Sequence, residues 1–318
     1  MSNSADPLVT IAIPTYNRAA RFLKYALKSA VAQTYENVQI LVSDNSSTDN
    51  TEELVSEIAD SRVEYVKHRE NIGANNNWNY CLQQARGRYF HLLHDDDLID
   101  SRFVATCMEA IARDEEPGLI RTGTRVIDDI GNVRSSRLNQ ASGNTVSDLI
   151  RAWFERRTSL YLCSTLYHTE GLREVGGLQS KKNLYQDVVA VVKVAAQRGH
   201  TGVPEVLASF RRHGANAGSA AEIGDWCDDA LYVLDVMCEV APDDARWIRS
   251  IGMPYFCKQN YGRALRLASW ADRWKALLVT YRKFQYVHSP VRYVSMRQAK
   301  RIRAAFGGSF GRPSRTAR

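Results

Sequence analysis

The first third of this 318-residue chain alternates between short apolar runs and segments with a helical spacing of apolar residues. The apolar runs, each of a length typical of a buried strand, are 9–13, 38–42, 63–66 and 89–93. The segments with helical spacing are 21–33, 46–58, 75–85 and 101–112. This alternation predicts the α/β class, with a parallel sheet that is covered by helices.

Polar side chains follow each predicted strand at the point where the strand ends. They are Tyr16 and Asn17, then Asp44, then Arg69 and Asn71, and last the run Asp95-Asp96-Asp97. Parallel sheets of this kind bind ligands at the carboxyl ends of their strands. Because four loops converge on the same edge of the sheet, the sequence predicts a ligand site there.

The acidic run is the most informative of these segments. Asp95, Asp96 and Asp97 are adjacent in sequence, and their mutual repulsion is costly unless a cation or a basic group offsets it. Mg²⁺ and Mn²⁺ favour carboxylate oxygens together with substrate phosphates. A solvated acidic loop is the alternative, but the position of the run directly after a buried strand favours a metal site.

The pattern after residue 118 predicts a change in architecture. A strand is expected at 119–127 and helices at 147–155 and 187–197, and beyond residue 219 the whole pattern is helical. The C-terminal helices are expected at 225–240, 243–266 and 271–286. We therefore expect a sheet domain over residues 1–218 and a helical C-terminal extension with a basic tail over residues 219–318.

Charge is distributed unevenly along the chain. Of the 42 Lys and Arg residues, 12 follow Asp272, whereas all 35 acidic residues lie at or before that position. A basic tail suggests an acidic partner such as an anionic membrane, and a solvated end is the alternative. An acceptor-site lid and a dimer contact are further readings of the C-terminal helices.

No stretch of the sequence resembles a membrane span or an apolar signal segment. We therefore expect a cytoplasmic protein, with peripheral contact at the inner face of the cell membrane as an extension of that expectation. The six cysteines are scattered without a CxxC pair, which favours reduced thiols over disulfides or zinc.

Four blocks of the sequence resemble family 2 glycosyltransferases. The blocks are Ile11-Ala12-Ile13-Pro14-Thr15-Tyr16-Asn17-Arg18, then residues 42–49, then Asn71-Ile72-Gly73 with residues 85–89, and last Leu93-His94-Asp95-Asp96-Asp97. They occur in the family's order within residues 8–105, and the last block is similar to its metal-binding DxD element.

The resemblance implies a GT-A fold, which is a Rossmann-like, mostly parallel sheet flanked by helices. It also implies an inverting transfer of a sugar from a nucleotide-diphosphate donor, with a lean to UDP, to an acceptor hydroxyl. It implies a hexosyltransferase that acts on a carbohydrate or lipid-linked acceptor, in the assembly of cell-surface polysaccharide, O-antigen or glycolipid. It also implies a divalent cofactor, Mn²⁺ or Mg²⁺. Whether the protein forms a homo-oligomer is open.

The resemblance also implies a set of residues that bind the donor. The backbone at Pro14, Thr15 and Tyr16 would border the base, and Asp44 would accept a hydrogen bond from it. Asp44 has an alternative role as a cap of the following helix. The remaining expected donor-binding residues are Arg18, Arg69, Asn71, Gly73 and Asp95.

The expected metal ligands are Asp96, Asp97 and His213, with Asp96 as the principal one. His94 departs from the family pattern, because it stands where an aspartate is usual. His213 ends the segment Phe210-Arg211-Arg212-His213, which is similar to a later family motif, and a packed histidine is its alternative role. Arg211 is expected to pair with phosphate or with an acidic neighbour.

Asp187 is the expected catalytic base. The family has a Glu-Asp pair before a helix, and Gln186-Asp187 stands at that place here. A carboxylate at this position would take the proton of the acceptor hydroxyl. A helix N-cap is the alternative role for Asp187.

A different class of function is the alternative to the enzyme. It is a non-catalytic protein that binds nucleotide sugars or nucleic acid, and the basic tail alone favours it. The acidic run and Asp187 argue against that alternative, so no nucleic-acid partner is expected.

Overall fold

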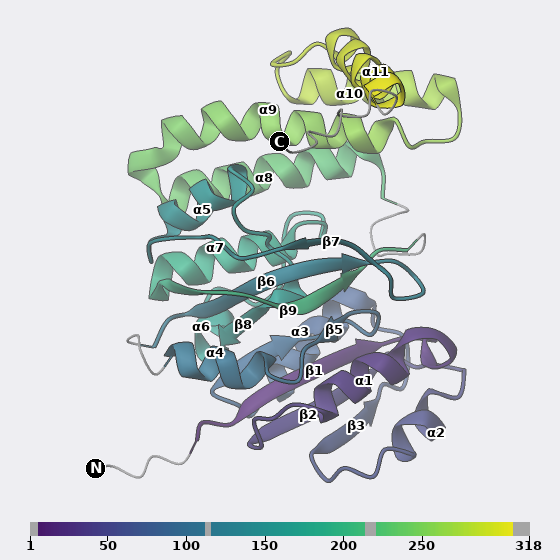
Figure 1. Ribbon diagram of the computed structural model, residues 1–318, viewed down its shortest axis with the longest axis vertical. Coiled ribbons are helices and arrows are strands. Elements are labelled where there is room, and N and C mark those ends of the chain that lie inside the picture. Colours follow the sequence, from purple (N-terminus) through teal and green to yellow (C-terminus); the bar gives the residue numbers. More distant parts are fainter. Residues whose placement is uncertain (1–5, 112–115, 214–220, 308–318) are drawn as a thin grey trace, which may run out of the picture.

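The computed structural model describes residues 6–111, 116–213 and 221–307 (Figure 1). The side chains of these residues are described up to residue 299. Within these residues the strands form a nine-stranded sheet. Its spatial order is β3 (Val63–Lys67), β2 (Val38–Asp44), β1 (Val9–Thr15), β4 (Tyr89–Leu92), β8 (Thr165–His168), β6 (Leu119–Ile127), β9 (His200–Arg211) and β5 (Leu98–Ile99), with β7 (Val133–Arg137) paired to β6.

The four predicted N-terminal strands are confirmed and are parallel to one another. β1 lies between β2 and β4, and β3 pairs with the far side of β2. Side chains alternate across β1, so that Ile11 and Ile13 join the core on one face while Ala12 joins the core on the other. Because both faces are covered, the strand is mostly apolar and does not alternate between apolar and polar residues.

Helices cover both faces of the sheet. On one face lie α1 (Lys24–Val31), α2 (Thr51–Ser56) and α4 (Phe103–Ile111), and on the other lie α3 (Ala74–Gln84), α5 (Val146–Phe154), α6 (Thr169–Glu174) and α7 (Gln186–Arg198). The helix predicted at 21–33 starts earlier, as a π-helical turn over η1 (Ala19–Leu23), and ends at Val31.

The sheet continues beyond β4 with strands that the sequence pattern did not predict. β8 is antiparallel to both β4 and β6, and β9 runs parallel to β6. Both new strands carry Thr and His among their apolar residues, so their period is weak. The strand predicted at 119–127 is confirmed as β6, and it connects the two halves of the sheet.

The C-terminal segment is helical, as predicted. It forms α8 (Ile223–Val240), α9 (Ala245–Ala264), α10 (Trp270–Lys283) and α11 (Pro290–Gly307), which stack at the end of the molecule opposite β3 (Figure 1). Apolar side chains of α8, α9 and α10, among them Leu234, Phe256 and Leu277, share one core with α5 and α7. The C-terminal helices therefore pack directly on the sheet domain.

The predicted boundary between residues 218 and 219 involves positions outside the described residues, so the two-domain division stays a prediction. None of the helices in the described part of the chain is both long and apolar enough to cross a membrane.

Candidate functional site

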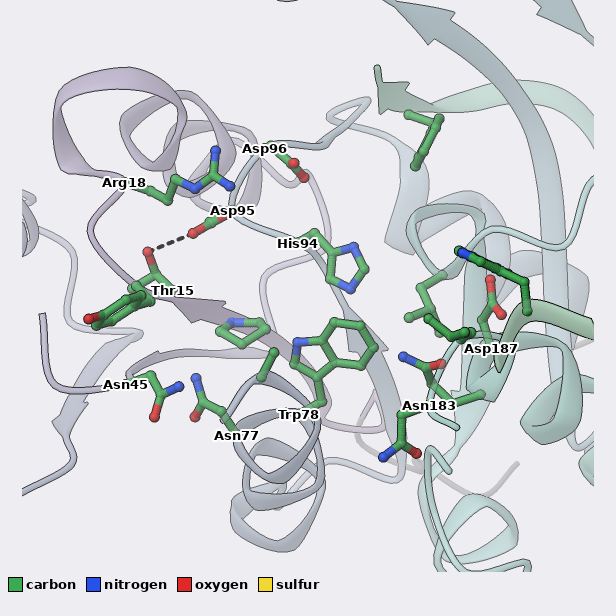
Figure 2. Close-up of a pocket in the computed structure, with 18 residues that line it drawn as sticks. Thr15, Arg18, Asn45, Asn77, Trp78, His94, Asp95, Asp96, Asn183 and Asp187 are labelled. Atoms are coloured by element: carbon green, nitrogen blue, oxygen red, sulfur yellow. Dashed lines mark hydrogen bonds between the residues drawn. The ribbon is translucent and has the colours of Figure 1, made fainter. Parts of the chain in front are cut away.

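A cavity of about 330 Å³ lies where β1 and β4 end, facing the first turn of α7 (Figure 2). Residues from several parts of the chain line it. They include Pro14, Thr15, Tyr16 and Arg18 at and just after the end of β1, Asn77 and Trp78 on α3, His94, Asp95 and Asp96 after β4, and Asn183, Gln186 and Asp187 around the start of α7. The cavity thus brings the ends of the first strands together with Asp187, which lies far along the chain, as the sequence predicts.

Asp95 lies against the end of β1. Its Oδ2 accepts a hydrogen bond of 2.8 Å from the Thr15 hydroxyl (Figure 2). Burial and the negative charge of Asp96 raise the pKa of Asp95 to about 7, although Thr15 and the positive charge of Arg18 act in the opposite direction. Asp95 is therefore placed among the residues expected to bind the donor, and its charge depends on what fills the cavity.

His94, Asp96 and Asp97 form a cluster whose candidate ligand atoms lie within 4.8 Å of one another. Burial and the charge of Asp96 raise the pKa of Asp97 well above its usual value. Burial lowers the pKa of His94, which keeps its imidazole neutral, and its buried Nε2 has no hydrogen-bond partner among the described atoms. Two carboxylates and a neutral imidazole suit a divalent cation.

The cluster differs in one member from the ligand set that the sequence predicts. His94, which the sequence marks only as a departure from the family pattern, belongs to it. His213 lies just beside it, with Nε2 2.7 Å from Asp96 Oδ2 and its ring stacked on Phe22 at a centroid distance of 5.0 Å. The role of His213 as a ligand stays a prediction.

Arg211, at the end of β9, holds the acidic turn in place. Its backbone N–H donates to Asp97 Oδ1 (2.8 Å), and its Nε donates to the carbonyl of Asp96 (2.7 Å). Its Nη1 donates to the carbonyls of Asp128 and Asp129. Arg211 is 4% exposed, so it links the acidic turn to the turn after β6 from within the protein.

Asp187 is the second residue of α7, which begins at Gln186. The alternative that Asp187 is the N-cap is therefore wrong, because Tyr185 occupies that position. Burial raises the pKa of Asp187 to about 6, while a 2.8 Å hydrogen bond from the N–H of Val188 and the charge of Arg121 oppose that rise. Asp187 lies across the cavity from Asp95 and Asp96, with His94 and Trp78 between them (Figure 2).

Asp44 does not belong to the residues that line the cavity. It is fully buried, and its Oδ2 accepts a 2.6 Å hydrogen bond from the Tyr65 hydroxyl. Its Oδ1 accepts the N–H of Ser47 at 2.8 Å, which closes the turn after β2. It does not cap α2, whose N-cap is Asn50. Its part in binding the base stays a prediction.

Arg69, Asn71 and Gly73 also lie outside the cavity lining. Asn71 nevertheless contacts a residue of the lining. Its Oδ1 accepts a 2.9 Å hydrogen bond from Nδ2 of Asn45, which lines the cavity. Gly73 has φ of +84° and starts α3, a conformation that favours glycine. The donor-binding roles of these residues stay predictions.

Several lining residues were not predicted from the sequence. They are Asn45, Ala74, Asn77, Trp78, Asn183, Leu184, Leu162, Phe210, Gln186 and Trp226. Trp78 packs against His94 with ring centroids 4.7 Å apart, and buried Asn77 is held by the Ser43 hydroxyl at 2.6 Å. Their spacing carries no signal, because they come together only when α3, α7, α8 and β9 are folded.

Comparison with known proteins identifies the chain's relatives. The model of the family described as "Glycosyl transferase family 2" matches residues 10–176. The Escherichia coli enzyme UDP-Glc:alpha-D-GlcNAc-diphosphoundecaprenol beta-1,3-glucosyltransferase WfaP is 41% identical over 91 residues, which are 28% of this chain and 36% of that enzyme. The chain spans about a fifth to three tenths of the length of several other curated relatives.

Two solved structures share the fold. The Staphylococcus aureus protein TarS (residues 1–349, in complex with UDP-GlcNAc) has a TM-score of 0.65 at 15% identity, over 88% of this chain and 81% of TarS. The mannosyltransferase PcManGT from Pyrobaculum calidifontis, in complex with GDP-Man and Mn²⁺, has a TM-score of 0.54 at 18% identity, over 95% of this chain and 87% of that one. The expected GT-A fold is confirmed.

More than half of the chain matches the family model, and the fold and the order of the sequence blocks agree with that match. The protein therefore belongs to glycosyl transferase family 2.

Proposed function

We propose that this protein is an inverting hexosyltransferase that moves a sugar from a nucleotide-diphosphate donor, with a lean to UDP, to an acceptor hydroxyl. The observation that carries the proposal is the cavity itself. It has Asp95 and Asp96 on one wall and Asp187 on the opposite wall (Figure 2). A displacement with inversion needs a leaving-group side and a base side that face each other across the sugar.

The wall after β1 is the donor side in this proposal. Thr15, Tyr16 and Arg18 line the cavity beside Asp95, which supports their roles next to the nucleotide. The lean to UDP is supported by TarS, whose structure holds UDP-GlcNAc, and by WfaP, which is named for UDP-Glc.

The cluster of His94, Asp96 and Asp97 would hold a divalent cation, Mn²⁺ or Mg²⁺, with His213 beside Asp96. Such a cation would offset the negative charge that develops on the departing diphosphate. Mn²⁺ in the PcManGT structure supports this assignment. The buried Nε2 of His94 has no hydrogen-bond partner among the described atoms, and the pKa of Asp97 is raised. Both observations fit a site that binds a cation.

Asp187 would act as the general base on the other wall. Its carboxylate takes the proton of the acceptor hydroxyl while the hydroxyl oxygen bonds to the anomeric carbon. The bond from that carbon to the diphosphate oxygen breaks on the opposite face, and the electron pair leaves with the nucleoside diphosphate. The pKa of about 6 keeps Asp187 ionised at neutral pH and more basic than an ordinary aspartate.

The proposed setting is the assembly of cell-surface polysaccharide, O-antigen or glycolipid, with a carbohydrate or lipid-linked acceptor. The name of WfaP, which includes a diphosphoundecaprenol-linked sugar, supports a lipid-linked acceptor. The helices α10 and α11 support peripheral contact with an anionic membrane, because they combine basic residues with exposed apolar ones. These are Lys275, Arg282, Arg292, Trp270, Leu278, Val291 and Met296.

Charge reversal tests the membrane contact. The variant with Lys275→Glu and Arg282→Glu should bind phosphatidylglycerol vesicles at least about thirtyfold more weakly in flotation, since each basic residue contributes about 1 kcal/mol near an anionic surface. The matched control changes Lys24→Glu and Lys28→Glu on the exposed surface of α1. Equal binding of the two variants, or no binding by the unmodified protein, would discard the membrane contact.

Removal of the base tests the catalytic role. Asp187→Asn should lower the rate of sugar transfer by about 10²–10⁴-fold, because the acceptor hydroxyl loses its proton acceptor. Binding of UDP should stay unchanged, as measured by calorimetry with Mn²⁺ present. Asp235→Asn, which only breaks an exposed ion pair with Arg249, is the control. Transfer at the unmodified rate in Asp187→Asn would show that the base is another group.

Substitution of the proposed principal ligand tests the metal site. UDP with Mn²⁺ should raise the melting temperature of the unmodified protein, and EDTA should remove that increase. Asp96→Asn should abolish the Mn²⁺-dependent part of the increase. The control, Asp129→Asn, changes an exposed carboxylate in the turn after β6 and should retain it. A full Mn²⁺-dependent increase in Asp96→Asn would contradict the assignment.

A further inference from the structure

One wall of the cavity comes from the C-terminal helices. Trp226, in the first turns of α8, lines the cavity together with residues at the start of α7. The guanidinium of Arg263 on α9 lies 3.8 Å from the centre of the indole ring, and the Tyr185 ring meets it edge-on at 5.4 Å. The orientation of the indole is therefore fixed by packing from two neighbouring elements.

Gln186 adds a polar group to the same wall. Its side chain is 8% exposed and lines the cavity, and its Oε1 has no hydrogen-bond partner among the described atoms. A buried polar atom is costly without a partner, and an amide both donates and accepts hydrogen bonds. Gln186 precedes Asp187 directly, so a ligand that satisfies the amide also lies next to the proposed base.

The buried carboxylate of Asp229 on α8 holds the loop that leads into this wall. Asp229 is fully buried and accepts the backbone N–H groups of Lys182 (2.9 Å), Leu184 (2.8 Å) and Tyr185 (2.9 Å). The hydroxyl of Ser180 donates to it as well, at 2.7 Å. These four bonds set the path of residues 180–185 and with it the start of α7.

Asn183 lies in the same loop and lines the cavity beside Asp187 (Figure 2). Its φ of +54° is a left-handed conformation, which asparagine tolerates better than most other residues. Asp229 accepts the backbone N–H groups of its two neighbours, Lys182 and Leu184, so it keeps Asn183 in this position.

We propose that Trp226 and Gln186 form the acceptor subsite of this enzyme, that its ligand is the pyranose ring of a sugar, and that Asp229 is its positioning residue. A pyranose has a C–H face that can lie on an indole ring and hydroxyls that can bond to an amide. Such a pairing of apolar area with a few fixed polar groups is how ligand pockets set orientation. One hydroxyl of that ring is the one from which Asp187 takes the proton.

The position of this wall separates it from the donor side. Asn183 and Asp187 lie opposite Arg18 and Asp95 across the cavity (Figure 2). The inference rests on the proposed transferase function, and it assigns to the C-terminal helices a direct part in binding the second substrate.

The test measures release of nucleoside diphosphate with Mn²⁺ and a panel of UDP-glucose, UDP-GlcNAc and GDP-mannose. Each donor is assayed with water alone and with p-nitrophenyl glycosides of glucose, galactose, mannose and GlcNAc. Trp226→Ala and Gln186→Leu should each raise the KM for the glycoside about tenfold or more, as truncation of a central contact does. That rise should exceed any change in the rate with water alone or in the KM for the donor. Trp270→Ala, which removes a 74% exposed tryptophan on α10, is the control.

Asp229→Asn tests the positioning role, because an amide has one acceptor oxygen where the carboxylate has two. The KM for the glycoside should rise about tenfold without a matching fall in the rate with water alone. A purely structural role would lower both rates together through the folded fraction. The matched control is Asp228→Asn, the neighbouring residue, which pairs at the surface with Lys283.

The outcomes distinguish the subsite from the function on which it rests. If no donor is hydrolysed or transferred, the proposed function fails and the subsite fails with it. If donors are hydrolysed but no glycoside accepts a sugar, the ligand is not a pyranose and the inference is overturned. An unchanged glycoside KM in Trp226→Ala would overturn the assignment of the wall, and an unchanged glycoside KM in Asp229→Asn would overturn the positioning role.

Discussion

The site depends on holding adjacent carboxylates at the end of a buried strand against their own repulsion. Two unit charges no more than 4.8 Å apart, the limit within which the ligand atoms of the cluster lie, repel by at least about 3 kcal/mol at an effective dielectric constant of 20. An exposed ion pair contributes about 1 kcal/mol or less, so a surface contact would not offset this repulsion. Arg211 instead donates from its backbone N–H to the carboxylate of Asp97 and from its Nε to the backbone carbonyl of Asp96, and a bound cation would supply the remaining charge.

The second constraint is the contact between the C-terminal helices and the loop that leads into α7. Asp229 fixes residues 180–185 through three backbone N–H groups and one hydroxyl, and α8 also contributes Trp226 to the cavity. The helical extension therefore shapes the wall that carries Asp187. The cavity is consequently assembled from distant parts of the chain, among them the strand ends near the N-terminus, the first turn of α7 and the first turns of α8.

The sequence predicts the parts of this arrangement that have a local signature. β1, β2 and β4 are mostly apolar because helices cover both faces of the sheet, and the acidic run is visible beside them. β8 and β9 escape prediction because polar residues interrupt their apolar pattern, and their place in the sheet depends on pairing with distant strands. Trp226 and Asp229 carry no signature, since their function depends on contacts that form after α8 packs on α7. His94 belongs to the acidic cluster, although its place in the sequence indicated only that it replaces the aspartate usual in the family.

The pH dependence of kcat/KM for sugar transfer, at saturating Mn²⁺, tests the opposed-wall arrangement most directly. Burial raises the pKa of Asp187 from its usual value near 3.8 to about 6, and only the ionised form accepts a proton. We expect kcat/KM to fall about tenfold per pH unit below pH about 6, and we expect the residual rate of Asp187→Asn to lack this limb. A flat profile in the unmodified protein, or the same limb in Asp187→Asn, would contradict the account.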